Sequence, residues 1–133
     1  MENDIEMMIR VLSILKNKYK LTDNLMVFTK ELEKAAEIND MESIGAVLSM
    51  RREAMEKIDN LNSEISRELV GMEKPCKDKI KRILESKAEP DELESQLEME
   101  ISDTNRMILS LLEKIVVLDK EINKRINKEA ASA

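Results

Sequence analysis

The residue types that most often do chemistry are scarce in this chain. Its 133 residues include no histidine, a single cysteine, and two glycines, Gly45 and Gly71, that stand far apart. Histidine is the usual general base and a frequent zinc ligand, and a phosphate-binding loop needs several glycines close together. The sequence therefore predicts no catalytic residue, no metal site and no cofactor, and the chain is not expected to be an enzyme.

One charged residue nevertheless falls on a predicted buried face. Arg51 lies between Leu48 and Met55 in the apolar stripe of a helix, within the sequence RREAMEKIDNL. This segment resembles the arginine-containing segments of small all-helical chorismate mutases, which clamp a dicarboxylate with several inward-facing cations. The further inward cations are missing here, and a single inward arginine more often pairs with a glutamate or extends past the apolar surface. A dicarboxylate site is therefore not expected.

The stronger candidate for a functional site is apolar. The segment MILSLLEKIVVL, at residues 107–118, is the most apolar stretch of its length in the chain. At about 100° per residue, the apolar residues of this helix fall into a heptad stripe and a second row rotated from it by about 110°. The heptad stripe comprises Leu97, Ile101, Thr104, Ile108, Leu111, Ile115, Leu118 and Ile122. The second row comprises Asn105, Leu109, Leu112 and Val116.

Two interpretations of the second row are open. In a three-helix bundle each helix faces two neighbours, so the chain itself can cover a wide apolar arc. Alternatively, the row is partly uncovered and binds an amphipathic helix from another protein, because an exposed apolar strip on a small protein usually marks a contact site. On this interpretation the partner-binding residues are Asn105, Leu109, Leu112 and Val116.

Long helices must position these side chains. Hydrophobic residues make up 42% of the chain but aromatic residues only 2%, and there are two prolines, which is typical of long helices packed as in coiled coils. The predicted fold is all-α, an antiparallel bundle of three long helices with a short helical connector and coiled-coil-like packing. It forms one domain over residues 1–133, with helices at about 4–37, 41–70 and 91–128 and the connector at 72–90. The alternative is a long helical hairpin that completes its core by dimerising.

Capping residues and apolar spacing set the expected helix ends and buried faces. Asn3 or Asp4 and then Asp40 are predicted to cap the first two helices, and Pro90 to open the third. The expected buried stripe of the first helix is Ile5, Met8, Ile9, Leu12 and Leu15, followed by Leu25, Phe28, Leu32 and Ala35. That of the second helix is Met41, Ile44, Leu48, Met55, Ile58, Leu61, Ile65 and Leu69. The connector has six basic against four acidic residues, and it is expected to be a solvated linker or else a basic contact surface.

Charge and cysteine content limit the partners and the compartment. The net charge is −6, with acidic and basic residues interspersed, so nucleic acid is not an expected partner. No apolar run approaches the roughly 20 residues that span a bilayer, so no membrane insertion is expected. The single cysteine, Cys76, cannot form an internal disulfide, which favours a reducing cytoplasm.

The central stretch AAEINDMESIGAVLSMRREAMEKIDNLNSEI resembles the FlgN family of flagellar type III export chaperones. In that family the first helix ends in alanines, and an acidic turn leads into a helix with arginine and a repeated apolar stripe. The residues that match this pattern are Asp40, Glu42, Ile44, Arg51, Arg52, Ile58, Leu61 and Ile65. The stretch DTNRMILSLLEKIV is similar to the family's C-terminal helix, in which an asparagine precedes a leucine-rich run, here Asn105, Leu109, Leu111 and Leu112. The related FliT-type chaperones share the same size and pattern.

The resemblance implies a cytoplasmic chaperone that binds the C-terminal amphipathic helical segment of hook–filament junction proteins. Such a chaperone prevents premature assembly of its client and aids its delivery to the export apparatus. The C-terminal helix would supply the apolar binding surface, which fits the second row. The alternative function is a self-associating coiled-coil scaffold without a client, in which the second row forms a homodimer interface.

Overall fold

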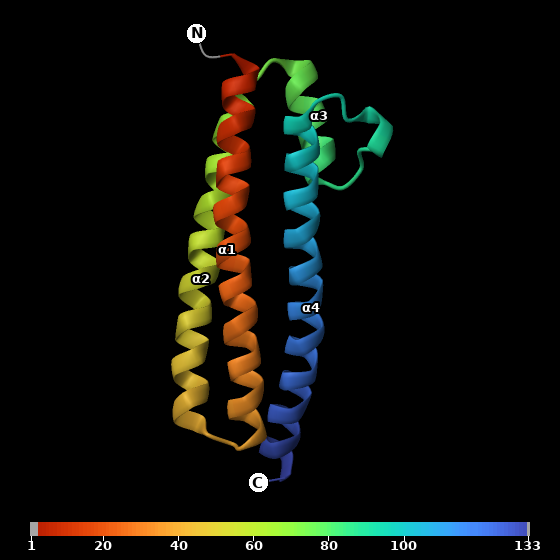
Figure 1. The fold of residues 1–133 in the computed structure, drawn as a ribbon. Helices are drawn as coiled ribbons and strands as arrows, with labels where there is room; N and C mark the ends of the chain where they lie inside the picture. The colour runs from red at the N-terminus through yellow and green to blue at the C-terminus, as the bar shows by residue number, and fades with distance from the viewer. Residues whose placement is uncertain (1–2, 133) are drawn as a thin grey trace.

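The computed structural model describes residues 3–132, and their side chains as far as residue 128. Over this range the chain is helical without any strand, and four α-helices pack together. They are α1 (Asp4–Glu37), α2 (Met41–Val70), α3 (Lys74–Leu84) and α4 (Gln96–Ser132), with a 3-10 turn at Pro90–Glu92. In Figure 1, α1 and α4 run downward and α2 runs upward between them in the chain.

Side-chain caps define the ends of the first two helices. The Asn3 side chain accepts a hydrogen bond from the amide of Glu6 at 2.8 Å, and Asp40 accepts from the amide and the hydroxyl of Ser43 at 3.2 and 2.6 Å. These bonds satisfy amide groups that have no partner inside a helix. The hydrogen bonds from Ser43 also hold the pKa of Asp40 below its ordinary value. Between the helices, Asn39 takes a left-handed conformation with φ 53°, which lets the chain reverse.

The last helix begins later than predicted. Pro90 opens only a short 3-10 turn, after which Leu93 is extended, and α4 starts at Gln96 rather than at about position 91. The Ser95 hydroxyl accepts a hydrogen bond from the amide of Glu98 at 3.1 Å and donates one to its carboxylate at 2.9 Å. The sequence SQLE at this point has the pattern of a capping box. That pattern, and not the proline, marks the start of α4.

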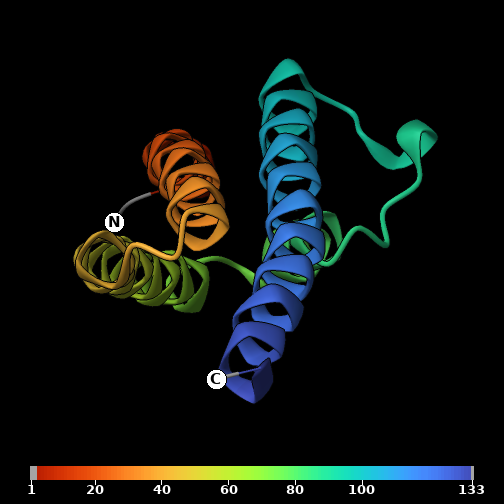
Figure 2. The same cartoon turned by 90° about the horizontal axis from the view of Figure 1, so that it is seen from below.

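α1 is the central helix. It packs against both α2 and α4, whereas in the described part of the chain the backbones of α2 and α4 scarcely approach each other. Figure 2, seen along the bundle, shows α1 and α2 side by side and α4 as a separate, inclined rod. In α4 every seventh residue of the predicted heptad stripe is buried, as a result of its packing on α1: Ile101, Ile108, Ile115 and Ile122.

The predicted stripe of α1 is wrong at its N-terminal end. Ile5 and Ile9 are 62% and 54% exposed, but Met8, Leu12 and Leu15 are buried as predicted. Val11, which the predicted stripe did not include, is fully buried. A spacing of three and four fits both sets of residues, so periodicity alone does not choose between two adjacent faces of the helix. The choice is made by the partners, because α1 must face α2 and α4 at once.

The predicted stripe of α2 is also wrong only in part, because Ile44, Ile58, Ile65 and Leu69 are buried as predicted. Leu48 and Met55 are partly exposed, and so is Met41 at the helix start. The buried seam runs instead through Val47 and Ala54, and it includes Arg51 between them. Small side chains on a seam let two helices approach closely, which leaves the longer neighbouring side chains at the rim.

The connector is not a solvated linker, because most of it folds onto the bundle. α3 is held by Ile80 and Ile83, both fully or almost fully buried in the same cluster as residues of α1, α2 and α4. Lys74, Lys81 and Arg82 of α3 are exposed, whereas Lys79 is only partly exposed and pairs with Glu98 of α4. At this end of the molecule four helices surround the core, and at the other end three do. After α3 the chain leaves sideways and returns to the same end before α4 begins (Figures 1 and 2).

Candidate protein-binding site

The second row of α4 is longer in the structure than in the prediction. Seven residues follow one another at alternating spacings of four and three, which keep a line of side chains on one face of a gently coiled helix. In chain order they are Glu98, Ser102, Asn105, Leu109, Leu112, Val116 and Asp119. Hereafter "the second row" means these seven residues. The row divides into a covered polar part, an apolar part and a polar end.

The part of the row nearest the start of α4 is polar and buried. Glu98 and Ser102 are both buried, and the Glu98 carboxylate lies 2.5 Å from the Nζ of Lys79 on α3. Lys79 also lies 3.5 Å from Glu94. Because the partners come from α3 and from the segment before α4, these contacts fasten α3 to the bundle.

The pKa values of Glu98 and Lys79 support an ion pair between α3 and α4. Burial alone would raise the pKa of Glu98, but hydrogen bonds from Lys79 and Ser95 and the charge of Lys79 outweigh it, and the pKa lies below its ordinary value. The hydrogen bond to Glu98, opposed by burial, raises the pKa of Lys79. Both groups are therefore charged at neutral pH, as an ion pair between α3 and α4 requires.

Asn105 ends the covered part of the row. Only 4% of its surface is exposed, and its Nδ2 donates hydrogen bonds to the carbonyl oxygens of Ile83 and Leu84 at 3.3 and 3.1 Å. The last carbonyl groups of a helix have no partner within it. Asn105 thus caps the C-terminus of α3, and the structure does not place it on a free surface.

The far end of the row is also tied down, by an ion pair between α2 and α4. Asp119 accepts a hydrogen bond from Arg51 at 2.7 Å, and Arg51 is buried. The inward-facing arginine of α2 therefore has a single acidic partner on α4. This ion pair explains why the arginine faces inward, so its position does not indicate a dicarboxylate site.

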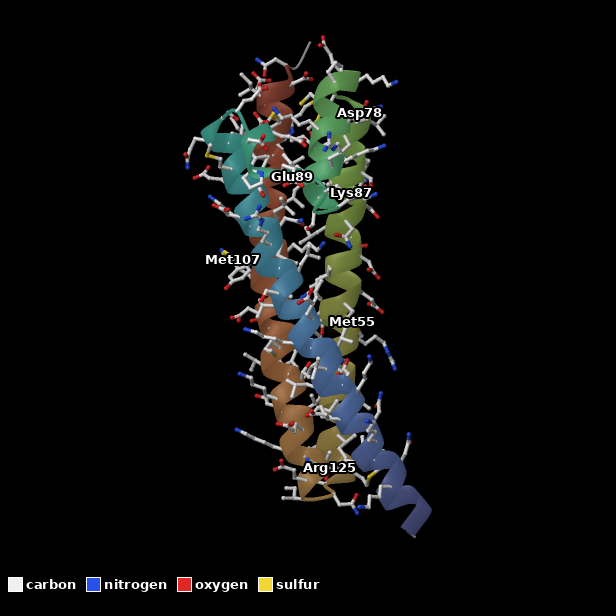
Figure 3. All side chains as sticks on the ribbon, turned by 90° about the vertical axis from the view of Figure 1, so that its right-hand side faces the viewer. Met55, Asp78, Lys87, Glu89, Met107 and Arg125 are labelled. Atoms are coloured by element: carbon white, nitrogen blue, oxygen red, sulfur yellow. The ribbon has the colours of Figure 1, made fainter. Side chains whose placement is uncertain are left out.

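Between Asn105 and Asp119 the row is apolar and only partly covered. Leu109 and Leu112 are half-buried, and Val116 is 50% exposed. We call these three residues the apolar strip. Leu112 packs against two of the three core clusters, so the strip is continuous with the core. In Figure 3, Met55 of α2 is labelled on the same side of the view as α3, and it is 42% exposed.

This arrangement inverts the usual distribution. Polar side chains are normally exposed and large apolar ones buried. Along this row, however, Glu98, Ser102 and Asn105 are buried, whereas the apolar residues are left partly in solvent. The difference follows the extent of α3: where α3 lies against α4 the row is covered, and beyond Leu84 it is not. A second helix that lay on α4 in line with α3, beyond its end, would cover the apolar strip.

Sequence reasoning found the apolar strip and Asn105 but missed the other polar residues of the row. Asp119 continues the spacing from Val116, and Glu98 and Ser102 continue it backward from Asn105. Because the row was defined mainly by apolar residues, none of its polar members except Asn105 was included. The capping-box pattern at Ser95 was the available signal for Glu98.

One other apolar hollow lies on α4, on the side that faces α1. It has a volume of about 550 Å³ and is lined by Met26, Lys30, Glu113, Lys114, Val117 and Leu118. Three of these six side chains are charged, and the hollow is shallow and open. It is therefore less suited than the apolar strip to an apolar helix face, and it provides a comparison site for mutagenesis.

A metal site and a membrane-spanning helix are two other features that would bear on function. Between positions 3 and 128, no group of three or more His, Cys, Asp or Glu side chains is placed to hold a metal ion. None of the helices in the described range is long and apolar enough to cross a membrane. In comparisons with known proteins, no family model, no curated protein and no solved structure matches this chain.

Proposed function

We propose that this protein binds an amphipathic helix of another protein along the apolar strip of α4. In keeping with its resemblance to the FlgN family, the proposed role is that of a cytoplasmic flagellar export chaperone without catalytic activity. Its client would be the C-terminal helical segment of a hook–filament junction protein. Binding would shield that segment from premature assembly and deliver it to the export apparatus.

The inverted polarity of the second row is the observation that carries the proposal. Leu109, Leu112 and Val116 form an apolar line about two helical turns long. It starts where one helix, α3, already lies on α4. The apolar line offers the kind of surface that an amphipathic helix binds with its apolar face.

The same proposal includes a finer description of the fold. We interpret the molecule as a bundle of three long helices with coiled-coil-like packing, in which α3 is a helical part of the connector. The buried isoleucines at every seventh position of α4 support this interpretation. The lone Cys76 and the interspersed charges fit a cytoplasmic protein.

A matched pair of adjacent valines tests the site. Val116 and Val117 are 50% and 57% exposed, but only Val116 belongs to the apolar strip. Val116→Asp should reduce capture of a hook–filament junction C-terminal peptide at least tenfold, and Val117→Asp should leave it nearly unchanged. Binding is measured by titration calorimetry, and circular dichroism verifies that both variants keep their helix content.

Three results would contradict the proposal. Equal loss in both variants would place binding on no particular face, and loss only in Val117→Asp would place it at the hollow between α1 and α4. If no junction peptide binds the unmodified chain, the chaperone role is wrong. Sedimentation of the chain alone tests the scaffold alternative: a dimer that persists at nanomolar concentration and dissociates in Val116→Asp would assign the strip to self-association.

A further inference from the structure

We propose that the bound helix lies end to end with α3, with its N-terminus at Leu84 and Asn105, and runs parallel to α4 as far as Asp119. This inference rests on the proposed function and adds the direction, the length and the contact chemistry of the partner segment. Each of these follows from what bounds the apolar strip.

The two ends of the strip set the length. At one end, Asn105 and the last turn of α3 occupy the row. At the other end, the ion pair between Arg51 and Asp119 ties α2 to α4. The interval from Asn105 to Asp119 is about 21 Å long at the helical rise of about 1.5 Å per residue. The partner therefore contacts this chain over roughly four helical turns.

The end of α3 sets the direction. α3 and α4 both run downward in Figure 1, so α3 presents its C-terminus to the strip. The C-terminus of a helix carries partial negative charge and the N-terminus partial positive charge. A partner helix that follows α3 in the same direction brings its N-terminus to this negative end. The reverse direction would bring two negative ends together.

The path of the connector leaves room for such an arrangement. Ser86, two residues after the end of α3, has a left-handed backbone with φ 59°, and the chain turns away from the bundle there. Figures 1 and 2 show that residues 85–95 pass on the outer side of α4, away from α2. The strip below α3 is therefore not covered by the chain's own loop.

The row also sets the chemistry of the partner's inner face. Between Glu98 and Asp119 the row carries no charged residue, and an unpaired charge is costly to bury against apolar side chains. The partner is thus a helix with leucine-like residues at spacings of three and four on one face, and with its charges on the other face.

A paramagnetic probe tests the direction. The probe is a blocked 18-residue synthetic peptide with leucine at alternating spacings of four and three and with Ala, Glu and Lys elsewhere, added at about 1 mM to the ¹⁵N-labelled full chain. A nitroxide is attached to its N-terminus in one preparation and to its C-terminus in another. The N-terminal nitroxide should broaden the amide signals of Leu84 and Asn105 at least twofold more than that of Asp119, and the C-terminal nitroxide should do the opposite.

The outcomes separate this inference from the proposed function. Binding at the strip with the reverse broadening pattern would overturn the direction and leave the proposed function in place. Broadening centred on Lys30 and Val117 would overturn the location and with it both proposals. If the peptide shifts no signal of the apolar strip, helix binding there is wrong. The Val116→Asp chain is the control, and its shifts should be at least fivefold smaller.

Discussion

The two halves of α4 meet their surroundings in opposite ways. In the half covered by α3, the second row is polar and every one of its members has a partner or is buried: Glu98 pairs with Lys79, and Asn105 caps α3. In the other half the row is apolar, and Val116 is half exposed. A short helix of 11 residues thus closes one half with polar contacts, although helices of that length are marginal on their own. The comparison teaches that polar contacts add to the apolar anchors Ile80 and Ile83 in fixing where α3 docks, and that the apolar residues beyond its end stay partly exposed.

The largest expected change in the free energy of unfolding distinguishes two neighbouring residues of α4, one in the core and one in the apolar strip. Ile108 is fully buried and Leu109 is half-buried. Ile108→Ala should lower the free energy of unfolding by about 3 kcal/mol, within the usual range for a buried aliphatic truncation. Leu109→Ala should lower it by less than about 1 kcal/mol, because that side chain loses less burial. Urea unfolding followed by circular dichroism measures both, and equal losses would show that Leu109 is a core residue.

The next effect concerns the ion pair that bounds the strip. Arg51→Met should lower the free energy of unfolding by about 2 kcal/mol, because it leaves Asp119, whose side chain is only 30% exposed, without its charged partner. The double variant Arg51→Met with Asp119→Leu should recover most of that loss, since no charge is then left buried. Thermal unfolding of the two single variants and the double variant gives the coupling between the residues. Purely additive losses would contradict the assignment of the pair.

The third effect concerns Asn105, which lies where the half of α4 covered by α3 meets the uncovered half. Asn105→Ala should lower the free energy of unfolding by about 1–2 kcal/mol, because two carbonyl groups of α3 lose their hydrogen bonds. The variant should also expose Cys76, the only cysteine of the chain and a residue of α3. Burial raises the pKa of the Cys76 thiol, and the nearby negative charges of Asp4 and Glu98 raise it further. Labelling with a maleimide should therefore be slow in the unmodified chain.

Faster labelling of Cys76 in Asn105→Ala would reveal looser docking of α3. The matched control is Asn123→Ala, which removes an exposed asparagine farther along the same helix. It should leave the labelling rate unchanged and raise the free energy of unfolding by no more than about 0.7 kcal/mol, because alanine has the higher helix propensity. Unchanged labelling in Asn105→Ala would mean that Asn105 does not hold α3 in place.

The smallest effect is a dependence on pH confined to the covered half. The pKa of Glu98 in the folded chain lies below its ordinary value of 4.5, so its stabilising contribution is complete above pH 4.5 and is lost as the pH falls through the lower folded value. The pKa of Lys79 lies above its ordinary value of 10.5, so its contribution is complete below pH 10.5 and is lost as the pH rises through the higher folded value. Amide chemical shifts of α3 should therefore change below pH 4.5 before those around Val116 do, and Glu98→Gln should remove that difference.

Local signals in the sequence predicted the helices better than their packing. Asn3 and Asp40 are caps that act within a few residues, so the starts of α1 and α2 could be read from them. The start of α4 was misplaced because Pro90 is compatible with a 3-10 turn as well as with an α-helix. Proline fixes its own φ angle but does not decide which hydrogen-bond pattern follows.

Packing could be predicted where the pattern had no competing solution. The isoleucines at every seventh position of α4 are all buried, because no other face of that helix is continuously apolar over the same length. In α1 and α2 two adjacent faces were apolar, and Ile5, Ile9 and Met55 proved to be on the exposed one. The docking of α3 could not be predicted, since it depends on polar residues more than 20 positions away, such as Asn105 with Ile83.

The central place of α1 has a consequence for how the chain matures during synthesis. α1 and α2 are neighbours in the chain and can pair as soon as both have left the ribosome, because closing a short turn is fast. α4, the last helix of 37 residues, must then return to α1 across the whole intervening chain. Until it does so, one flank of the nascent hairpin, including Leu15 and Leu25, is open to water. Chains that stall before α4 is complete should therefore be a preferred substrate for general folding factors and proteases.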